Sequence, residues 1–263
     1  MLLKALQTSL AEFEERVYGI DTRQFDADFS KIWNQFFNGS YEKGEDLYKT
    51  LLDKPYCVLS KPAIRQATML IETRLLSEVK KDFAQALQVG KEALGITDKD
   101  LQDATGNIIL ENIAIKTYTL AEYRLLFQIA VATDRTGDAS TASSIYQALV
   151  DALDDESKNY NIRKKLLPAM FANLSSHLFK QERYDELYHY SKRGLAFCAD
   201  VNEHKAEGCL LNFHAIALQE SGRPTEALPL FKKPCAVFAH RGDLKRYQQV
   251  KDGVRERYNI DLS

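Results

Sequence analysis

A repeated pattern of helix, break and helix is the feature that most constrains the fold of this chain. Two consecutive segments, 168–198 and 209–238, each contain an apolar helix, a short polar break and a second helix. An aromatic residue follows nine positions after each break, and the two breaks lie 41 residues apart. The same spacing also occurs twice upstream. The four break residues and their aromatic partners are Gly39 with Tyr48, Gly137 with Tyr146, Gln181 with Tyr190 and Gly222 with Phe231.

Self-similarity at this period, combined with helical periodicity of the apolar residues, is typical of a tetratricopeptide-like (TPR-like) repeat. We therefore predict an all-α fold: a TPR-like helical-repeat solenoid of about five helix pairs. A last helix over 244–258 has no partner helix behind it, and we expect it to cap the C-terminal end or to form a dimer contact. Residues 96–118 do not fit the period, which predicts an inserted short helix around 107–116.

Local signals place several helix starts. Thr119 and Glu122 have the spacing of a capping box, in which each side chain bonds to the other residue's backbone amide. Pro62 is expected in the first turn of its helix, where its missing N–H costs nothing. The first central helix is expected to begin near Pro168, after a polar loop at 154–161. The basic run 163–165 is interpreted as a solvated helix start.

Composition excludes several classes of protein. The chain has 263 residues, of which 45% are hydrophobic and 27% charged, as expected of a folded domain. A net charge of −2 argues against nucleic-acid binding by bulk electrostatics. No apolar run approaches the about 20 residues that a membrane span requires. The N-terminus does not resemble a secretory signal. The expected location is therefore the cytoplasm, with no membrane contact.

Signals of catalysis are missing from the sequence. It contains no HExxH, GxSxG, P-loop or GxGxxG motif, and its five histidines form no i, i+4 pair that would place two metal ligands on one helical face. The four cysteines show no metal-binding spacing and are expected to be reduced thiols. We therefore predict a protein that is not an enzyme and that requires no cofactor or metal.

Candidate ligand-binding residues lie on the first helix of each pair, because those helices line the concave face of a right-handed helical solenoid. Asn173 and Asn212 occupy nearly equivalent places in successive repeats, and a carboxamide can bond both the N–H and the C=O of a bound peptide. His177 stands one turn from Asn173. Arginines on first helices could pair with a peptide carboxylate. The predicted peptide-binding residues are Asn173, Asn212, His177, Arg124, Arg74, Phe127, Phe171 and Phe213.

Each of these candidates also has a structural alternative. The two asparagines could bond neighbouring helix ends inside the stack. The arginines, including Arg65, could form surface salt bridges. The aromatic residues could belong to the core, where such side chains are common.

The C-terminal third of the chain resembles the Rgg/MutR/GadR family of pheromone-sensing regulators of Gram-positive bacteria. The resemblance rests on PAMFANLSSHLFKQERYDELYHYSKRGLAFC, ALQESGRPTEALPLFKKPCAVFAHRGD and VKDGVRERYNI. The start, LLKALQTSLAEFEERVYG, is similar to the last helix of that family's N-terminal helix-turn-helix domain. This implies that 1–20 is a remnant of that domain or its linker helix. Residues 21–263 would then form the TPR-like peptide-binding and dimerisation domain.

The resemblance implies the sensor domain of a transcriptional regulator. Such a domain would bind a short signalling peptide in its concave groove and would form a homodimer. DNA would be contacted only through a helix-turn-helix domain that this chain does not contain. The alternative is a TPR scaffold that binds a peptide segment of another protein, with no link to DNA. A third hypothesis, a response-regulator phosphatase on a helical-repeat frame, lacks an identifiable catalytic residue.

Overall fold

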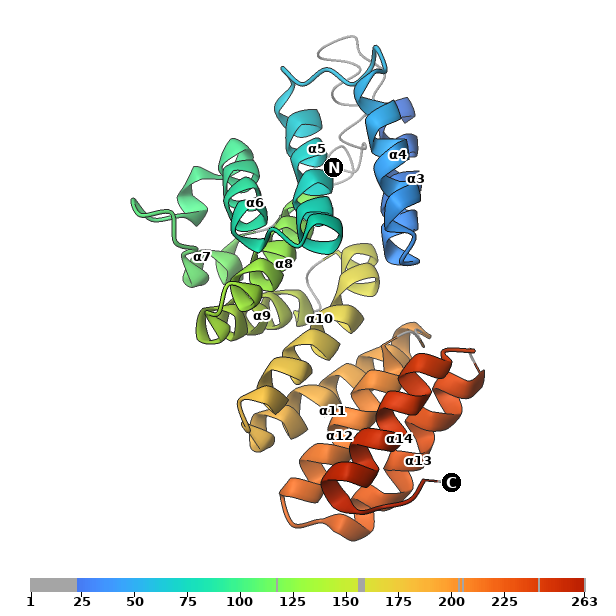
Figure 1. Cartoon of the computed structure of the whole chain (residues 1–263). Coiled ribbons are helices and arrows are strands. Elements are labelled where there is room, and N and C mark those ends of the chain that lie inside the picture. The colour runs from blue at the N-terminus through green and yellow to red at the C-terminus, as the bar shows by residue number, and fades with distance from the viewer. Residues whose placement is uncertain are drawn as a thin grey trace, which may run out of the picture. The chain divides into compact units, whose positions relative to one another are not determined.

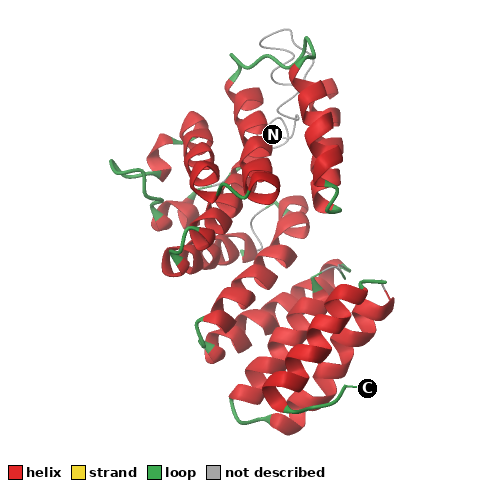
Figure 2. Cartoon of the chain, viewed as in Figure 1, coloured by secondary structure: helices red, strands yellow, loops and turns green. Residues whose placement is uncertain are grey.

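The computed structural model describes residues 23–116, 118–155, 159–202, 204, 206–240 and 242–262. These residues form twelve α-helices and no strand, apart from one isolated bridge between Gln102 and Ile108 (Figure 2). The helices are α3 (Arg23–Phe37), α4 (Tyr41–Leu52), α5 (Pro62–Leu75), α6 (Phe83–Thr97), α7 (Leu110–Ile115), α8 (Leu120–Arg135), α9 (Ala139–Asp154), α10 (Tyr160–Lys180), α11 (Tyr184–Val201), α12 (Glu207–Glu220), α13 (Pro224–His240) and α14 (Leu244–Tyr258) (Figure 1).

The order of these helices confirms the predicted all-α repeat architecture. Five consecutive pairs run from α3 to α13, with the short helix α7 inserted before α8 and the single helix α14 at the end. The inserted helix is shorter than the predicted 107–116. A five-residue π-helix, Leu76–Lys80, extends α5, and Lys81 beyond it adopts a left-handed conformation at φ 57°.

The chain divides into two compact units. One comprises 23–109 and Tyr118–Gly137, and it contains α3 to α6 and α8. The other comprises 110–116 and 138–262, and it contains α7 and α9 to α14. The predicted remnant at 1–20 lies outside the described residues. The assignment of 21–263 to one binding and dimerisation domain stays a prediction.

The repeated aromatic residues of the second helices connect neighbouring repeats. The Tyr146 ring on α9 lies 4.8 Å from the ring of His177 on α10. The Phe231 ring on α13 lies 5.6 Å from that of Tyr258 on α14. Tyr190 on α11 is buried and donates its hydroxyl proton to Asp151 on α9. The spacing found in the sequence therefore marks side chains that join one helix pair to the next.

Helix starts follow the predicted capping chemistry. Thr119 and Glu122 form a complete capping box at α8, and Pro62 occupies the first turn of α5. Asp138 follows Gly137, whose φ is 101°, and its carboxylate accepts the N–H of Thr141 at the start of α9. A position with φ in this range favours glycine, because a residue with a side chain would be strained there.

The prediction that the first central helix begins near Pro168 is wrong. Helix α10 begins at Tyr160 and contains Pro168 in its interior. The start is fixed by Asn159, whose side-chain oxygen accepts two backbone amide protons, and by Arg163, whose Nε donates to the carbonyl oxygen of Leu153. Arg163 is only 9% exposed, so the interpretation of 163–165 as a solvated helix start is also wrong for this residue.

Close packing of α11 generates a first prediction. A Cβ atom at Gly194 would lie 2.9 Å from Cβ of Phe171 on α10 and 3.0 Å from Cδ1 of Leu210 on α12. Gly194→Ala should therefore lower the free energy of unfolding by about 1–3 kcal/mol. Gly253→Ala in the exposed part of α14 meets nothing within 4 Å. This control should raise the free energy of unfolding by about 0.5–1 kcal/mol.

Urea denaturation followed by circular dichroism measures both changes. Equal effects of the two substitutions would contradict the close approach of α10, α11 and α12.

Candidate functional site

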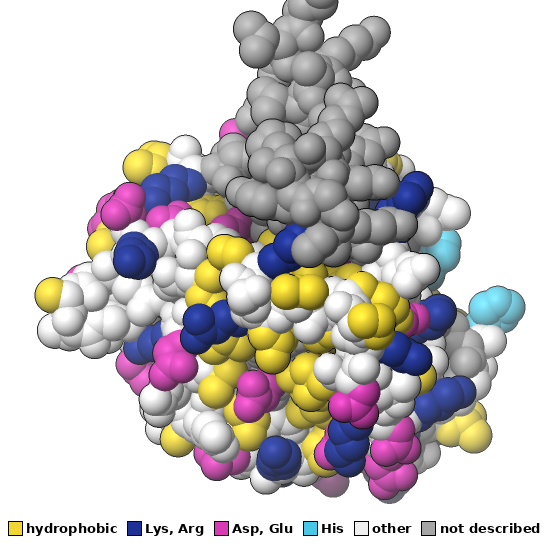
Figure 3. Space-filling model, turned by 90° about the horizontal axis from the view of Figure 1, so that it is seen from above, with side chains coloured by type: hydrophobic (Ala, Val, Ile, Leu, Met, Phe, Trp, Pro, Cys, Tyr) yellow, Lys and Arg dark blue, Asp and Glu magenta, His cyan; other side chains and the backbone are white. Residues whose placement is uncertain are grey.

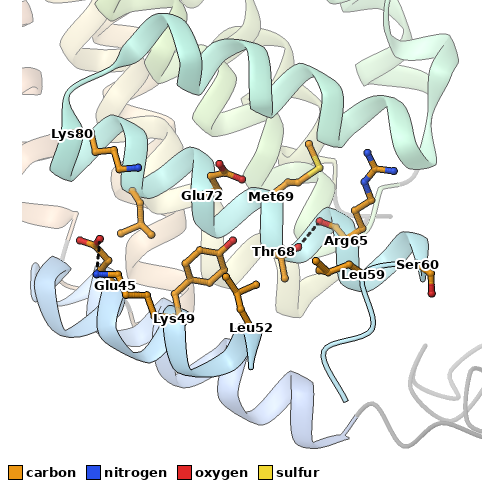
Figure 4. Close-up of a pocket in the computed structure, with 12 residues that line it drawn as sticks. Glu45, Lys49, Leu52, Leu59, Ser60, Arg65, Thr68, Met69, Glu72 and Lys80 are labelled. Atoms are coloured by element: carbon orange, nitrogen blue, oxygen red, sulfur yellow. Dashed lines mark hydrogen bonds and ion pairs between the residues drawn. The ribbon is translucent and has the colours of Figure 1, made fainter. Parts of the chain in front are cut away.

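An open groove lies between α4 and α5 in the unit that contains them (Figure 4). Its volume is about 760 Å³, which is within the usual size range of ligand sites. Helix α4 packs on α3, while α5 packs on α6 and α8, so the surfaces that α4 and α5 turn toward each other remain partly uncovered. The lining residues are Glu45, Tyr48, Lys49, Leu52, Leu59, Ser60, Arg65, Thr68, Met69, Glu72, Leu75 and Lys80.

The connection between the two helices forms one end of the groove. Helix α4 ends at Leu52 and α5 begins at Pro62, so residues 53–61 cross from one helix to the other. Tyr56 in this connection donates its hydroxyl proton to Oδ2 of Asp28 on α3. Hydrogen bonds from Lys31 and Tyr56 hold the pKa of Asp28 below its usual value. The connection is thus attached to α3, and Leu59 and Ser60 form one end of the groove.

The groove exposes an apolar surface. Leu52 is 40% exposed and Leu59 is 50% exposed, although both are large hydrophobic residues. Half-buried Met69 and neighbouring Glu72 line the groove from the α5 side (Figure 4). Burial, followed by the charge of Glu72, raises the pKa of Tyr48 far above neutrality. Its hydroxyl is therefore always protonated and able to donate a hydrogen bond.

Charges of both signs surround this apolar surface. Lys49 forms an ion pair with Glu45 at 3.1 Å. Arg65, Glu72 and Lys80 also line the groove and form no ion pair with any described residue. The groove can therefore accept apolar side chains while offering hydrogen-bonding charges to a peptide backbone or terminus.

The predicted residues of the first unit lie on α5 and α8. Nη2 of Arg74 lies 3.5 Å from Oε1 of Glu78. This ion pair is the structural alternative considered for Arg74. Arg124 stacks on the ring of Trp33, with its guanidinium carbon 4.3 Å from the ring centroid. Burial lowers the pKa of Arg124 to about 10. Phe127 is half-buried on α8.

Two of the predicted residues in the second unit belong to the core. Phe171 is fully buried beneath α11, and His177 is 4% exposed against Tyr146. Neither side chain contributes to an exposed surface. The structural alternative considered for the aromatic residues is therefore correct for Phe171.

The two predicted asparagines have different surroundings. Asn173 is half-buried, and its Nδ2 donates to the carbonyl oxygen of Ala169 in the same helix at 2.8 Å. Oδ1 of Asn212 is shielded from solvent and has no hydrogen-bond partner. The neighbouring Phe213 ring lies 6.0 Å from that of Phe179. The two-point grip on a peptide backbone stays a prediction.

The α4–α5 groove was not found from the sequence. Tyr48 was recognised as a repeat aromatic, but Leu52, Leu59, Met69 and Glu72 were not singled out. The only available signal was the apolar residues on both sides of the Lys54–Pro55 break. Such residues could equally have closed the gap between two packed helices.

Other kinds of site are not indicated by the described residues. They contain no group of three or more His, Cys, Asp or Glu side chains able to hold a metal ion, and none of their helices is long and apolar enough to span a bilayer. Acidic and basic side chains are interspersed around hydrophobic ones on the face shown in Figure 3.

Solved structures of TPR-like repeat proteins are similar to this chain. BtubC (BKLC) from P. vanneervenii matches with a TM-score of 0.61 and 12% identity, over 88% of this chain and 87% of that chain. Two structures of a Podosopora anserina protein described as a kinesin light chain with nearly identical TPR-like repeats match with TM-scores of 0.54 and 0.53 at 14% identity. They cover 84% and 83% of this chain and 97% and 96% of their own.

No family model and no curated protein matches the sequence. Identities of 12–14% with the solved structures bear on the fold alone. The backbone comparison and the helix order agree: this chain has the TPR-like helical-repeat fold.

Proposed function

We propose that this protein is an interaction domain that binds an extended peptide segment in the α4–α5 groove. The observation that carries the proposal is the exposed apolar surface of Leu52, Leu59 and Met69 beside unpaired charged side chains. Burial of such apolar area drives association, while a few placed polar groups set the orientation of the bound segment. The TPR-like fold supports this role, because helical repeats present extended surfaces that suit extended partners.

The narrower form of this proposal follows the Rgg/MutR/GadR resemblance. In that form the ligand is a short signalling peptide and the protein is a homodimeric, cytoplasmic sensor domain of a transcriptional regulator. The similarity of 168–198 and of the closing segment to that family supports this narrower form. A scaffold that binds a segment of another protein uses the same groove without any link to DNA.

The groove generates a direct prediction. Leu59→Glu places a carboxylate on its apolar rim and should weaken binding of a groove-bound peptide by about tenfold or more, since burying an unpaired charge is costly. The matched control is Leu228→Glu in α13, where the leucine is 44% exposed and lies outside the groove.

Peptides selected by phage display on the intact protein, measured by fluorescence anisotropy, provide the test. Binding by Leu59→Glu with the affinity of the unmodified protein would exclude the groove as the site. Loss of binding in Leu228→Glu alone would place the site in the second unit.

The narrower form has its own prediction. Short hydrophobic peptides secreted by the source organism should bind in isothermal titration, and light scattering should give the mass of a dimer. The double variant Asn173→Ala, Asn212→Ala should bind such a peptide more weakly, because each lost amide removes a hydrogen bond worth about 1 kcal/mol. Equal affinities of the two proteins would remove these asparagines from the site.

A further inference from the structure

The Arg124 guanidinium lies over an aromatic ring. Its central carbon is 4.3 Å from the centroid of the Trp33 ring. Its Nε nitrogen is shielded from solvent and has no hydrogen-bond acceptor. No described acidic residue forms an ion pair with it. Within the described part of the chain, this charge therefore has an aromatic ring beside it and no counterion.

This arrangement costs folding free energy. Moving a charge out of water is unfavourable unless a partner compensates for the lost hydration. The cation–π contact returns part of that cost. Burial with no compensating acid lowers the pKa of Arg124 to about 10, so the group is still charged at neutral pH. A residue that weakens the fold in this way is expected where a ligand supplies the missing partner.

A second polar group beside Arg124 also lacks a partner. Gln128 lies one helical turn further along α8, so the two side chains project from the same face. Gln128 is 1% exposed, and its Oε1 is buried without a hydrogen-bond donor. An unpaired buried acceptor costs about 1–3 kcal/mol. Gln128 exposes almost no surface to a ligand, so Arg124 alone carries the inference.

We propose that Arg124, which lies over Trp33, binds a carboxylate of a bound peptide. Either the free C-terminus of the peptide or an acidic side chain supplies this group. The planar guanidinium matches a carboxylate with two parallel hydrogen bonds. The inference rests on the proposed peptide-binding function but not on the α4–α5 groove.

The charge count favours a carboxylate over a phosphate. A phosphate carries a charge close to −2 at neutral pH, and its binding sites are typically built from clusters of cations. Arg74, the other predicted arginine of this unit, is held by Glu78. A single guanidinium is therefore suited to a single negative charge.

The chain contains one tryptophan, so Trp33 fluorescence reports on this site alone. The probes are three pools of N-acetylated random octapeptides. One has a free C-terminal carboxylate and no Asp or Glu, one is C-terminally amidated with a single Glu, and one is amidated with no acidic residue. The first or second pool should change the emission in a saturable way, and the third should not. The responding pool identifies a terminal or a side-chain carboxylate as the ligand group.

Substitution separates binding from folding. Arg124→Met should abolish the response or weaken it at least tenfold, as expected when one partner of a shielded charge pair is removed. Arg124→Lys should retain only part of it, because the planar fork and the stacking are lost. The matched control is Arg135→Met at the exposed end of the same helix, which should respond like the unmodified protein. Without peptide, Arg124→Met should melt no lower than the unmodified protein.

Three results would overturn the inference: equal responses of Arg124→Met and the unmodified protein, an equal response to the uncharged pool, or a loss of folding in Arg124→Met. Peptides whose binding depends on Leu59 but not on Arg124 would refute the carboxylate site and leave the proposed function intact. A response that depends on Arg124 but not on Leu59 would exclude the groove as the peptide site and leave the carboxylate site intact.

Discussion

The contact between the aromatic residue of one helix pair and the first helix of the next supports the rest of this fold. Tyr146 on His177 and Phe231 on Tyr258 are two cases of the same connection. Each repeat is too small to bury its own apolar face, so its core is completed by a neighbour. Packing between successive helices is also close at Gly194, where an added Cβ atom would meet Phe171 and Leu210. A side chain that enlarges one helix surface therefore disturbs both neighbours.

At the α4–α5 groove, a neighbouring helix only partly covers the apolar face of the repeat. Tyr48 has the same position in its repeat as Tyr146 and Phe231, yet it is half-buried and lines an open space. The connection at 53–61 joins the end of α4 to the start of α5, and Tyr56 attaches it to Asp28 on α3. An incomplete contact between repeats exposes apolar area that the solenoid would otherwise cover. Such a surface is suited to a bound peptide segment that completes the packing.

Arg124 and Arg74 show that two arginines in similar sequence positions can have different surroundings. Arg74 and Arg124 look alike in the sequence, since both lie on first helices of neighbouring pairs. Arg74 has Glu78 as an ion-pair partner, although its Nε is also buried without an acceptor, whereas Arg124 has the face of Trp33 and no ion-pair partner among the described residues. The difference between the two arginines depends on which side chains surround them. It points to a ligand for one and to a structural ion pair for the other.

The sequence by itself determined the helix order, the five pairs, the last helix and the Thr119–Glu122 capping box, because periodicity and capping act over one or two turns. It also predicted a binding role for Arg124, from its place on a first helix. It failed at Pro168, since the capping by Asn159 and the burial of Arg163 outweigh the usual effect of proline. Only the tertiary structure decided that His177 and Phe171 are core residues, that α4 and α5 leave a groove, and that Arg124 has no counterion among the residues that the structure describes. Burial and pairing depend on residues distant in the sequence, and the pattern of one helix does not reveal them.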